Sequence, residues 1–205
     1  LDHPEVDILH FWLSDGMNNH CECPDCQKLS PSDWYARLVN TISSKLAERN
    51  CSTRIVFLCY ANTLWPPIQE NIEDNHRNTI FMFAPITRCY IHRLTDSQCA
   101  GSVSLEPPPR NRVAPPRTNC EFTQLLRAWQ QRCQSDSFLF DYHFWFGMDG
   151  LDFLIGNIGR ILWHDIRDLR ELGLNGFLSC QTLRAFYPTG IPMAILANTA
   201  WNSQA

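Results

Sequence analysis

The sequence has 205 residues, of which 44% are hydrophobic and 12% aromatic, and these values suit a globular protein with a sizeable core. Its formal net charge is −4 and its 17 basic residues are scattered, which argues against a protein that follows a nucleic-acid backbone. Charges and prolines break every apolar stretch before the roughly 18 residues of a membrane span, so we expect no membrane partner.

The first residues and the cysteines bear on the cellular compartment. The chain has neither a visible signal peptide nor an initiator Met, so we expect a missing upstream segment. Ten cysteines are many for a cytosolic enzyme, yet fewer than a disulfide scaffold carries. Most lie inside predicted strands and helices, where a free thiol packs as a small hydrophobe. We therefore expect reduced thiols and favour the cytoplasm.

The first predicted elements are a buried strand at 7–14 and a helix that starts near Ser30. Ser30 can cap this helix, Pro31 suits its first position, and Asp33 completes a capping-box-like pattern. Apolar residues then recur at helical spacing to about Arg49, which predicts where the helix ends.

Strands and helices continue to alternate along the rest of the chain. Further strands are predicted at 54–61, 79–86, 137–146 and 176–180. The Pro-rich region at about 99–118 is predicted to be an irregular loop. Helices are predicted near 120–129 and at 157–172, with Gly173 placed to end the second. On that second helix, Asp165 and Asp168 are expected to form a solvated face.

The predicted strands are too apolar to have a wet face, which is typical of a parallel sheet covered by helices. About five such strands fit either an open doubly wound sheet or part of a barrel. The stretch from Gly147 to Gly150 approaches a nucleotide-binding turn but lacks the G-x-G-x-x-G spacing, so a nucleotide site is disfavoured.

Carboxylates, an arginine and aromatic side chains gather at the carboxyl ends of these strands, where parallel α/β folds place their chemistry. They are Trp12, Asp15, Tyr60, Trp65, Arg88, Asp141, Tyr142, His143, Trp145 and Gln181. Aromatic faces stack on pyranose rings and carboxylates supply acid, base or nucleophile, so this set predicts a sugar site. The alternative is structural, with Asp15 capping a turn and the Asp141–His143 run satisfying buried polar groups.

A second constellation is the run HCECPDC at 20–26, in which Cys21, Cys23 and Cys26 form a C-x-C-x-x-C cluster. Three thiolates at this spacing can reach one tetrahedral ion, so the loop is a candidate for structural zinc. The fourth ligand comes from His20, Cys89, His92 or Cys99, and we choose Cys89. Reduced packing cysteines and a disulfide remain as alternatives.

Nearly the whole chain resembles a known family. The resemblance rests on the segments HFWLSDGMNNHCECPDCQ, SDWYARLVN, RIVFLCYA, IFMFAPITRCYIH, FLFDYHFWF and GLNGFLSCQTLRAFYPTGIPMAILANTAW, which follow the family's order. That family is bacterial domain-of-unknown-function family 4838, which looks like a glycoside hydrolase barrel. It is distantly similar to glycoside hydrolase family 163, whose members are endo-β-N-acetylglucosaminidases that act on complex N-glycans.

The resemblance implies that residues 1–205 are the C-terminal part of a TIM-type (β/α)₈ barrel with about five βα units. It also implies a carbohydrate substrate, with a glycan that contains N-acetylhexosamine expected, and no cofactor for catalysis. The glutamates offer little at strand ends, so we expect Asp15 and Asp141 to be the catalytic pair. Two rivals stay open, a non-catalytic carbohydrate-binding relic and an α/β protein built around its cysteine metal site.

Overall fold

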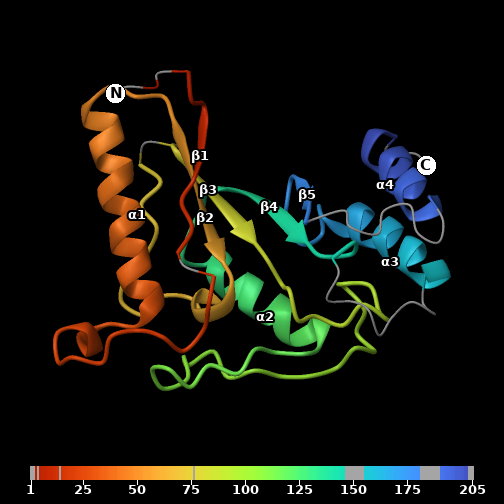
Figure 1. Ribbon diagram of the computed structural model, residues 1–205, viewed down its shortest axis with the longest axis horizontal. Coiled ribbons are helices and arrows are strands. Elements are labelled where there is room, and N and C mark those ends of the chain that lie inside the picture. The colour runs from red at the N-terminus through yellow and green to blue at the C-terminus, as the bar shows by residue number, and fades with distance from the viewer. Residues whose placement is uncertain are drawn as a thin grey trace. The chain divides into compact units, whose positions relative to one another are not determined.

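Strands and helices alternate along the chain, as predicted (Figure 1). The computed structural model describes residues 3, 5–13, 15–75, 77–145, 155–180 and 190–202. The strands are β1 (Ile8–His10), β2 (Arg54–Cys59), β3 (Thr79–Phe83), β4 (Asp136–Asp141) and β5 (Phe177–Ser179). The helices are α1 (Pro31–Glu48), α2 (Asn119–Gln130), α3 (Ile155–Asp168) and α4 (Ile191–Trp201), with short 3-10 helices η1 (Cys26–Lys28) and η2 (Ala61–Thr63).

The strands follow the order β1-β2-β3-β4-β5, and the β1–β2, β2–β3 and β4–β5 pairs are parallel. The predicted α/β class with a parallel sheet is therefore confirmed. By its internal contacts the chain divides into two compact units. Unit 1 is Leu1–Ala84, Val103–Pro115 and Gln124–Ser137, and unit 2 is Pro85–Ser102, Pro116–Thr123 and Phe138–Ala205. Among the described residues, no helix has the length and apolarity needed to cross a bilayer.

The core of unit 1 surrounds β2 and β3. Every residue of β3 is buried, and so is every residue of β2 after Arg54, which confirms that these strands have no wet face. The rings of Phe57, Phe81 and Trp129 pack together with centroids 5.5 to 6.1 Å apart. In contrast, β1 is exposed along its length, so the predicted strand at 7–14 is shorter and less buried than expected.

The start of α1 confirms the predicted capping box. Asp33 N donates to Ser30 Oγ at 3.1 Å and Ser30 N donates to Asp33 Oδ2 at 3.2 Å, while Pro31 takes the first helical position. Asp33 Oδ1 also accepts from the backbone N–H groups of Gln69 and Glu70 at 2.8 and 2.9 Å. This buried carboxylate therefore holds α1 to the segment that follows η2.

We expect Asp33→Ala to lower the free energy of unfolding by about 2 kcal/mol, because it removes a helix cap and leaves part-buried N–H groups unpaired. Burial raises the pKa of Asp33, but hydrogen bonds from Ser30, Glu70 and Gln69 outweigh it and the pKa lies below its usual value. The contribution is therefore present at neutral pH and is lost as the pH falls below about 4. Urea unfolding at pH 7 and pH 3 measures it.

A matched control for this prediction is Asp136→Ala, which breaks a surface ion pair with Arg54. It should cost less than about 1 kcal/mol, because exposed ion pairs contribute little. Equal losses in the two variants, or an Asp33→Ala effect that persists undiminished at pH 3, would contradict the assigned role.

Unit 2 contains the β4–β5 pair and the packed helices α3 and α4 (Figure 1). Helix α3 ends at Asp168, earlier than predicted, and the chain then turns through Gly173, whose φ is 70°. Glycine adopts this left-handed conformation at little cost, so it ends the helical region as expected. Residues 99–118 contain neither helix nor strand, which confirms the predicted irregular loop.

Candidate functional sites

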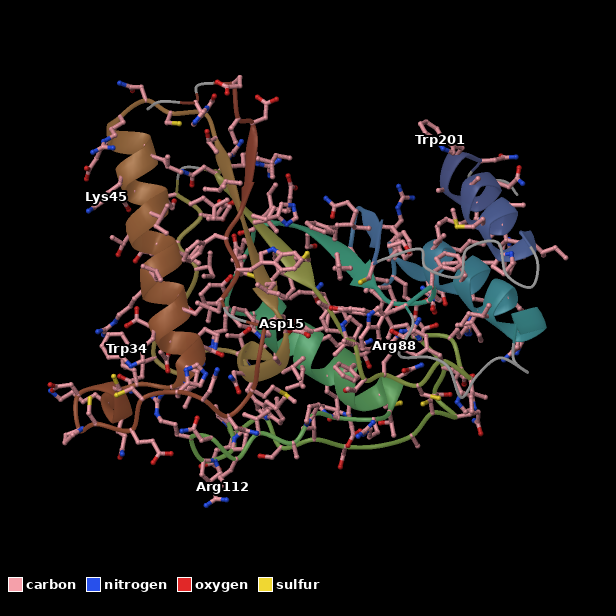
Figure 2. The ribbon with its side chains drawn as sticks, viewed as in Figure 1. Asp15, Trp34, Lys45, Arg88, Arg112 and Trp201 are labelled. Carbon is pink, nitrogen blue, oxygen red and sulfur yellow. The ribbon has the colours of Figure 1, made fainter. Side chains whose placement is uncertain are left out.

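A carboxylate and two aromatic side chains lie at the carboxyl ends of β1 and β2 in unit 1. Tyr60 directly follows β2, and its Oη donates to Asp15 Oδ1 at 2.9 Å (Figure 2). The segment around Asp15 is held in place by Asn62 of η2, which accepts from Asn18 N at 3.1 Å and donates to Gly16 O at 3.3 Å. The tyrosine thus orients a carboxylate that remains exposed to solvent. We call Trp12, Asp15 and Tyr60 the unit 1 rim.

The tryptophans predicted near the strand ends differ in exposure. Trp12 is 46% exposed and its Nε1 donates to His10 Nδ1 at 3.1 Å. Trp65 is buried and its Nε1 donates to Ser104 O at 2.8 Å, so it belongs to the core of unit 1. Trp145, in unit 2, is half-buried, with its ring edge-on to Tyr142 at 6.0 Å. In unit 1, Trp12 is therefore the tryptophan of this set that is exposed to solvent.

Arg88, labelled in Figure 2, is the centre of a buried network of four polar side chains in unit 2. Arg88 Nε bonds Asp141 Oδ2 at 3.0 Å, and Arg88 Nη2 contacts both Asp165 Oδ2 and, at 3.0 Å, His143 Nε2. His143 Nε2 also lies 3.0 Å from Asp165 Oδ2, and its Nδ1 lies 3.3 Å from Asp141 Oδ1. We call these four residues the arginine network.

The arginine network is closed to solvent, since its four side chains are all 0% exposed. Burial acts to lower the pKa of Arg88, but Asp141 and Asp165 raise it further, so the guanidinium stays charged. Burial also opposes ionisation of Asp165, yet Arg88 and then His143 outweigh it and hold the pKa of that carboxyl below its usual value. The network thus pairs one buried guanidinium with two buried carboxylates.

This burial bears on the predicted site residues. Arg88, Asp141, Tyr142 and His143 are each less than 7% exposed, so this structure offers none of these side chains to a ligand. These surroundings fit the structural alternative, in which the run Asp141–His143 satisfies buried polar groups. Gln181 lies outside the described residues.

Asp165 is the partner that sequence reasoning missed. The expectation of a solvated face is wrong for this residue, because Asp165 is 0% exposed and its Oδ1 also accepts from Leu94 N at 2.6 Å. The sequence did contain a signal that Asp165 is buried, because its spacing of four residues from Ile161 and from Leu169 places it on the apolar side of the helix. Asp168 is half-buried and binds Arg93 and Thr95.

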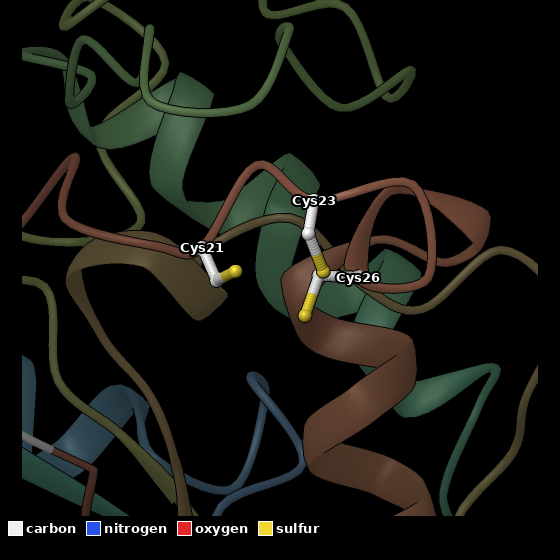
Figure 3. A group of neighbouring side chains, drawn as sticks. All are labelled: Cys21, Cys23 and Cys26. Carbon is white, nitrogen blue, oxygen red and sulfur yellow. The ribbon is translucent and has the colours of Figure 1, made fainter.

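The three cysteines of the loop at 21–26 come together in unit 1, as their spacing predicts (Figure 3). Their sulfur atoms lie within 4.8 Å of one another, and we call Cys21, Cys23 and Cys26 the loop cluster. The backbone N–H of Cys26 and then neighbouring thiols lower the pKa of Cys23 to about 7. Near neutral pH this residue is therefore partly thiolate, the form that binds a metal ion.

Residues of the Pro-rich region fasten this loop. Arg110 Nη2 donates to Leu29 O at 2.7 Å and also to Cys26 O. Asn111 exchanges two hydrogen bonds with the backbone of His20, both at 2.8 Å. Cys89, our predicted fourth ligand, instead groups with His92 and Cys99 in unit 2.

Comparison of the chain with protein-family models, with curated proteins and with solved structures gave no match. The resemblance to a glycoside hydrolase barrel family therefore remains a prediction from the residues.

Proposed function

We propose that this chain is a carbohydrate-active module of glycoside-hydrolase type, built as part of a TIM-type barrel, and that the unit 1 rim contacts the glycan. The observation that carries the proposal is an exposed carboxylate, Asp15, oriented by Tyr60 at the carboxyl ends of two parallel strands. Enzymes with parallel α/β folds bind their substrates at this edge of the sheet.

The chemistry of the rim suits a sugar. Trp12, three residues before Asp15 in the chain, is 46% exposed, and the C–H groups of a pyranose ring can stack on an exposed indole. Asp15 can accept hydrogen bonds from sugar hydroxyl or amide groups, and the bond from Tyr60 orients it. An exposed indole and an oriented carboxylate supply the two kinds of contact that an N-acetylhexosamine offers.

A specific observation favours non-catalytic carbohydrate binding as the second candidate function. Hydrolysis by two carboxyl groups requires both to reach the glycosidic bond. Asp15 is exposed, whereas Asp141, its predicted partner, is fully buried in the arginine network. A rim with one exposed carboxylate binds a glycan without needing to cleave it, and turnover by the wild-type protein decides between the two functions.

We expect Trp12→Ala to weaken glycan binding about 5- to 10-fold, because a stacked aromatic face contributes roughly 1 kcal/mol. Isothermal titration with an N-acetylglucosamine-containing N-glycan measures the change. The matched control is Trp201→Ala, which removes a tryptophan that is 91% exposed at the end of α4. Equal weakening in both variants, or none in Trp12→Ala, would contradict binding at the rim.

We also propose that the loop cluster binds structural zinc. Three sulfur atoms within 4.8 Å of one another match the donor set of such sites, and the partly ionised Cys23 lowers the cost of forming the thiolates. His20 is a candidate for the fourth ligand, because among the described residues its buried Nε2 has no hydrogen-bond partner. Zinc analysis of freshly purified, reduced Cys21→Ser/Cys23→Ser protein should show one ion per chain fewer than wild type.

A further inference from the structure

A second sulfur and nitrogen cluster lies within unit 2, and neither the rim nor the loop cluster accounts for it. The ligand atoms of Cys89, His92 and Cys99 all lie within 4.8 Å of one another, and Cys89 Sγ is 3.3 Å from His92 Nδ1. In a tetrahedral zinc site, bond lengths of about 2.3 Å to sulfur and about 2.0 Å to nitrogen separate the ligands by roughly 3.5–3.8 Å. The observed spacing is therefore close to that of a coordinated set.

One buried residue, Asn119, contacts all three residues through its side chain and its backbone N–H. Asn119 Oδ1 accepts from Cys89 N at 3.0 Å, and Asn119 Nδ2 donates to His92 O at 3.0 Å and to Arg93 O at 2.9 Å. Asn119 N donates to Cys99 Sγ at 3.2 Å, and the residue is 0% exposed. Hydrogen bonds of this kind orient metal ligands, and an N–H directed at sulfur stabilises a thiolate.

We propose that Cys89, His92 and Cys99 bind a zinc ion, with Cys120 as the fourth ligand. Cys120 directly follows Asn119, and its N–H donates to Cys99 O at 3.3 Å. Its Sγ lies outside the group of three and is 3.8 Å from Asp96 O, so a change of its side-chain rotamer would bring it to the ion. Three sulfurs and one imidazole form a donor set typical of structural zinc.

The ion would also position the arginine network. Arg88 precedes Cys89 in the chain, and its Nη1 donates to Cys89 O at 3.2 Å. Fixing Cys89 and His92 on one ion therefore fixes the backbone from which the guanidinium reaches Asp141 and Asp165. The ion would link the segment after β3 to the start of α2, and both segments belong to unit 2.

Cobalt titration of a variant that lacks the loop cluster, Cys21→Ser/Cys23→Ser/Cys26→Ser, isolates this site. We expect one equivalent of Co²⁺ to bind, with intense d–d bands of tetrahedral coordination and a thiolate charge-transfer band. Adding Cys89→Ser or His92→Ala should abolish these bands, and adding Cys120→Ser should weaken the charge-transfer band. Adding Cys51→Ser, a half-buried cysteine of unit 1 outside both clusters, should leave them unchanged.

The absence of a tetrahedral cobalt spectrum in a folded loop-cluster variant would overturn the proposal. A Cys89–Cys99 disulfide that persists in protein purified under reducing conditions, seen as a mass two hydrogens lower per chain, would also overturn it. Unchanged bands after Cys120→Ser would overturn the choice of the fourth ligand. If the triple variant fails to fold, alkylation of the wild-type protein replaces it. Cys89 and Cys99 should then react with iodoacetamide at least 10-fold faster after chelation, whereas Cys51 should not change.

Discussion

Asp165→Ala is expected to lower the free energy of unfolding by about 3–5 kcal/mol, the cost of breaking a buried ion pair by removing one partner. Among the described residues, the substitution leaves Asp141 as the one carboxylate that pairs with the buried guanidinium of Arg88. It also removes the acceptor of Leu94 N, so a buried backbone donor is left unpaired. Chemical unfolding of the purified variant measures the loss.

Asp168→Ala is the matched control, because it removes the same side chain three residues later on the same helix. Its partners, Arg93 and Thr95, are partly exposed, so we expect a loss of about 1 kcal/mol. Asp165 has a lowered pKa in the folded protein, so its contribution is present at neutral pH and disappears as the pH falls below about 4. Similar losses in both variants would mean that the arginine network does not stabilise unit 2.

Asp15→Asn is expected to reduce kcat/KM on an N-acetylhexosamine glycan by about 10²- to 10⁴-fold, the usual contribution of a carboxyl group in acid–base catalysis. An amide oxygen still accepts the hydrogen bond from Tyr60, and the site is exposed, so the melting temperature should hardly change. Turnover of aryl N-acetylglucosaminides and N-glycans by the purified variants measures the effect.

Asp25→Asn is the control for this substitution, since it changes an exposed aspartate whose carboxylate pairs with Lys28 on the surface. An undiminished kcat/KM of Asp15→Asn would contradict a catalytic role for Asp15. Glycan binding without turnover by the wild-type protein would instead favour the non-catalytic function, in which the same residue only positions the sugar.

The parts of the fold that depend on local chemistry could be predicted from the sequence. The start of α1 needs only Ser30, Pro31 and Asp33 in the right order, and the structure shows the capping box that they form. The strands at 54–59 and 79–83 were recognisable because they are apolar throughout. In contrast, α4 was not predicted, because its residues are apolar all round and leave no helical period to detect.

The candidate sites depend on partners distant in the chain, and there the sequence was less informative. Arg88 lies 77 residues from Asp165, and only folding shows that they pair. Charge alone suggested a solvated Asp165, although its spacing from Ile161 and Leu169 indicated a buried face. Cys89 was assigned to the loop cluster, yet the nearby His92 and Cys99 were the better partners by distance along the chain.

The measurement that tests the glycan-binding rim most directly is a titration of ¹⁵N-labelled protein with an N-acetylglucosamine-containing N-glycan, followed through the indole N–H resonances. The chain has seven tryptophans, and single substitutions assign those of Trp12 and Trp201. We expect the Trp12 resonance to shift saturably and the Trp201 resonance to stay in place. A Trp12 resonance that does not move at saturating glycan, or one that moves no more than that of Trp201, would contradict the proposed site.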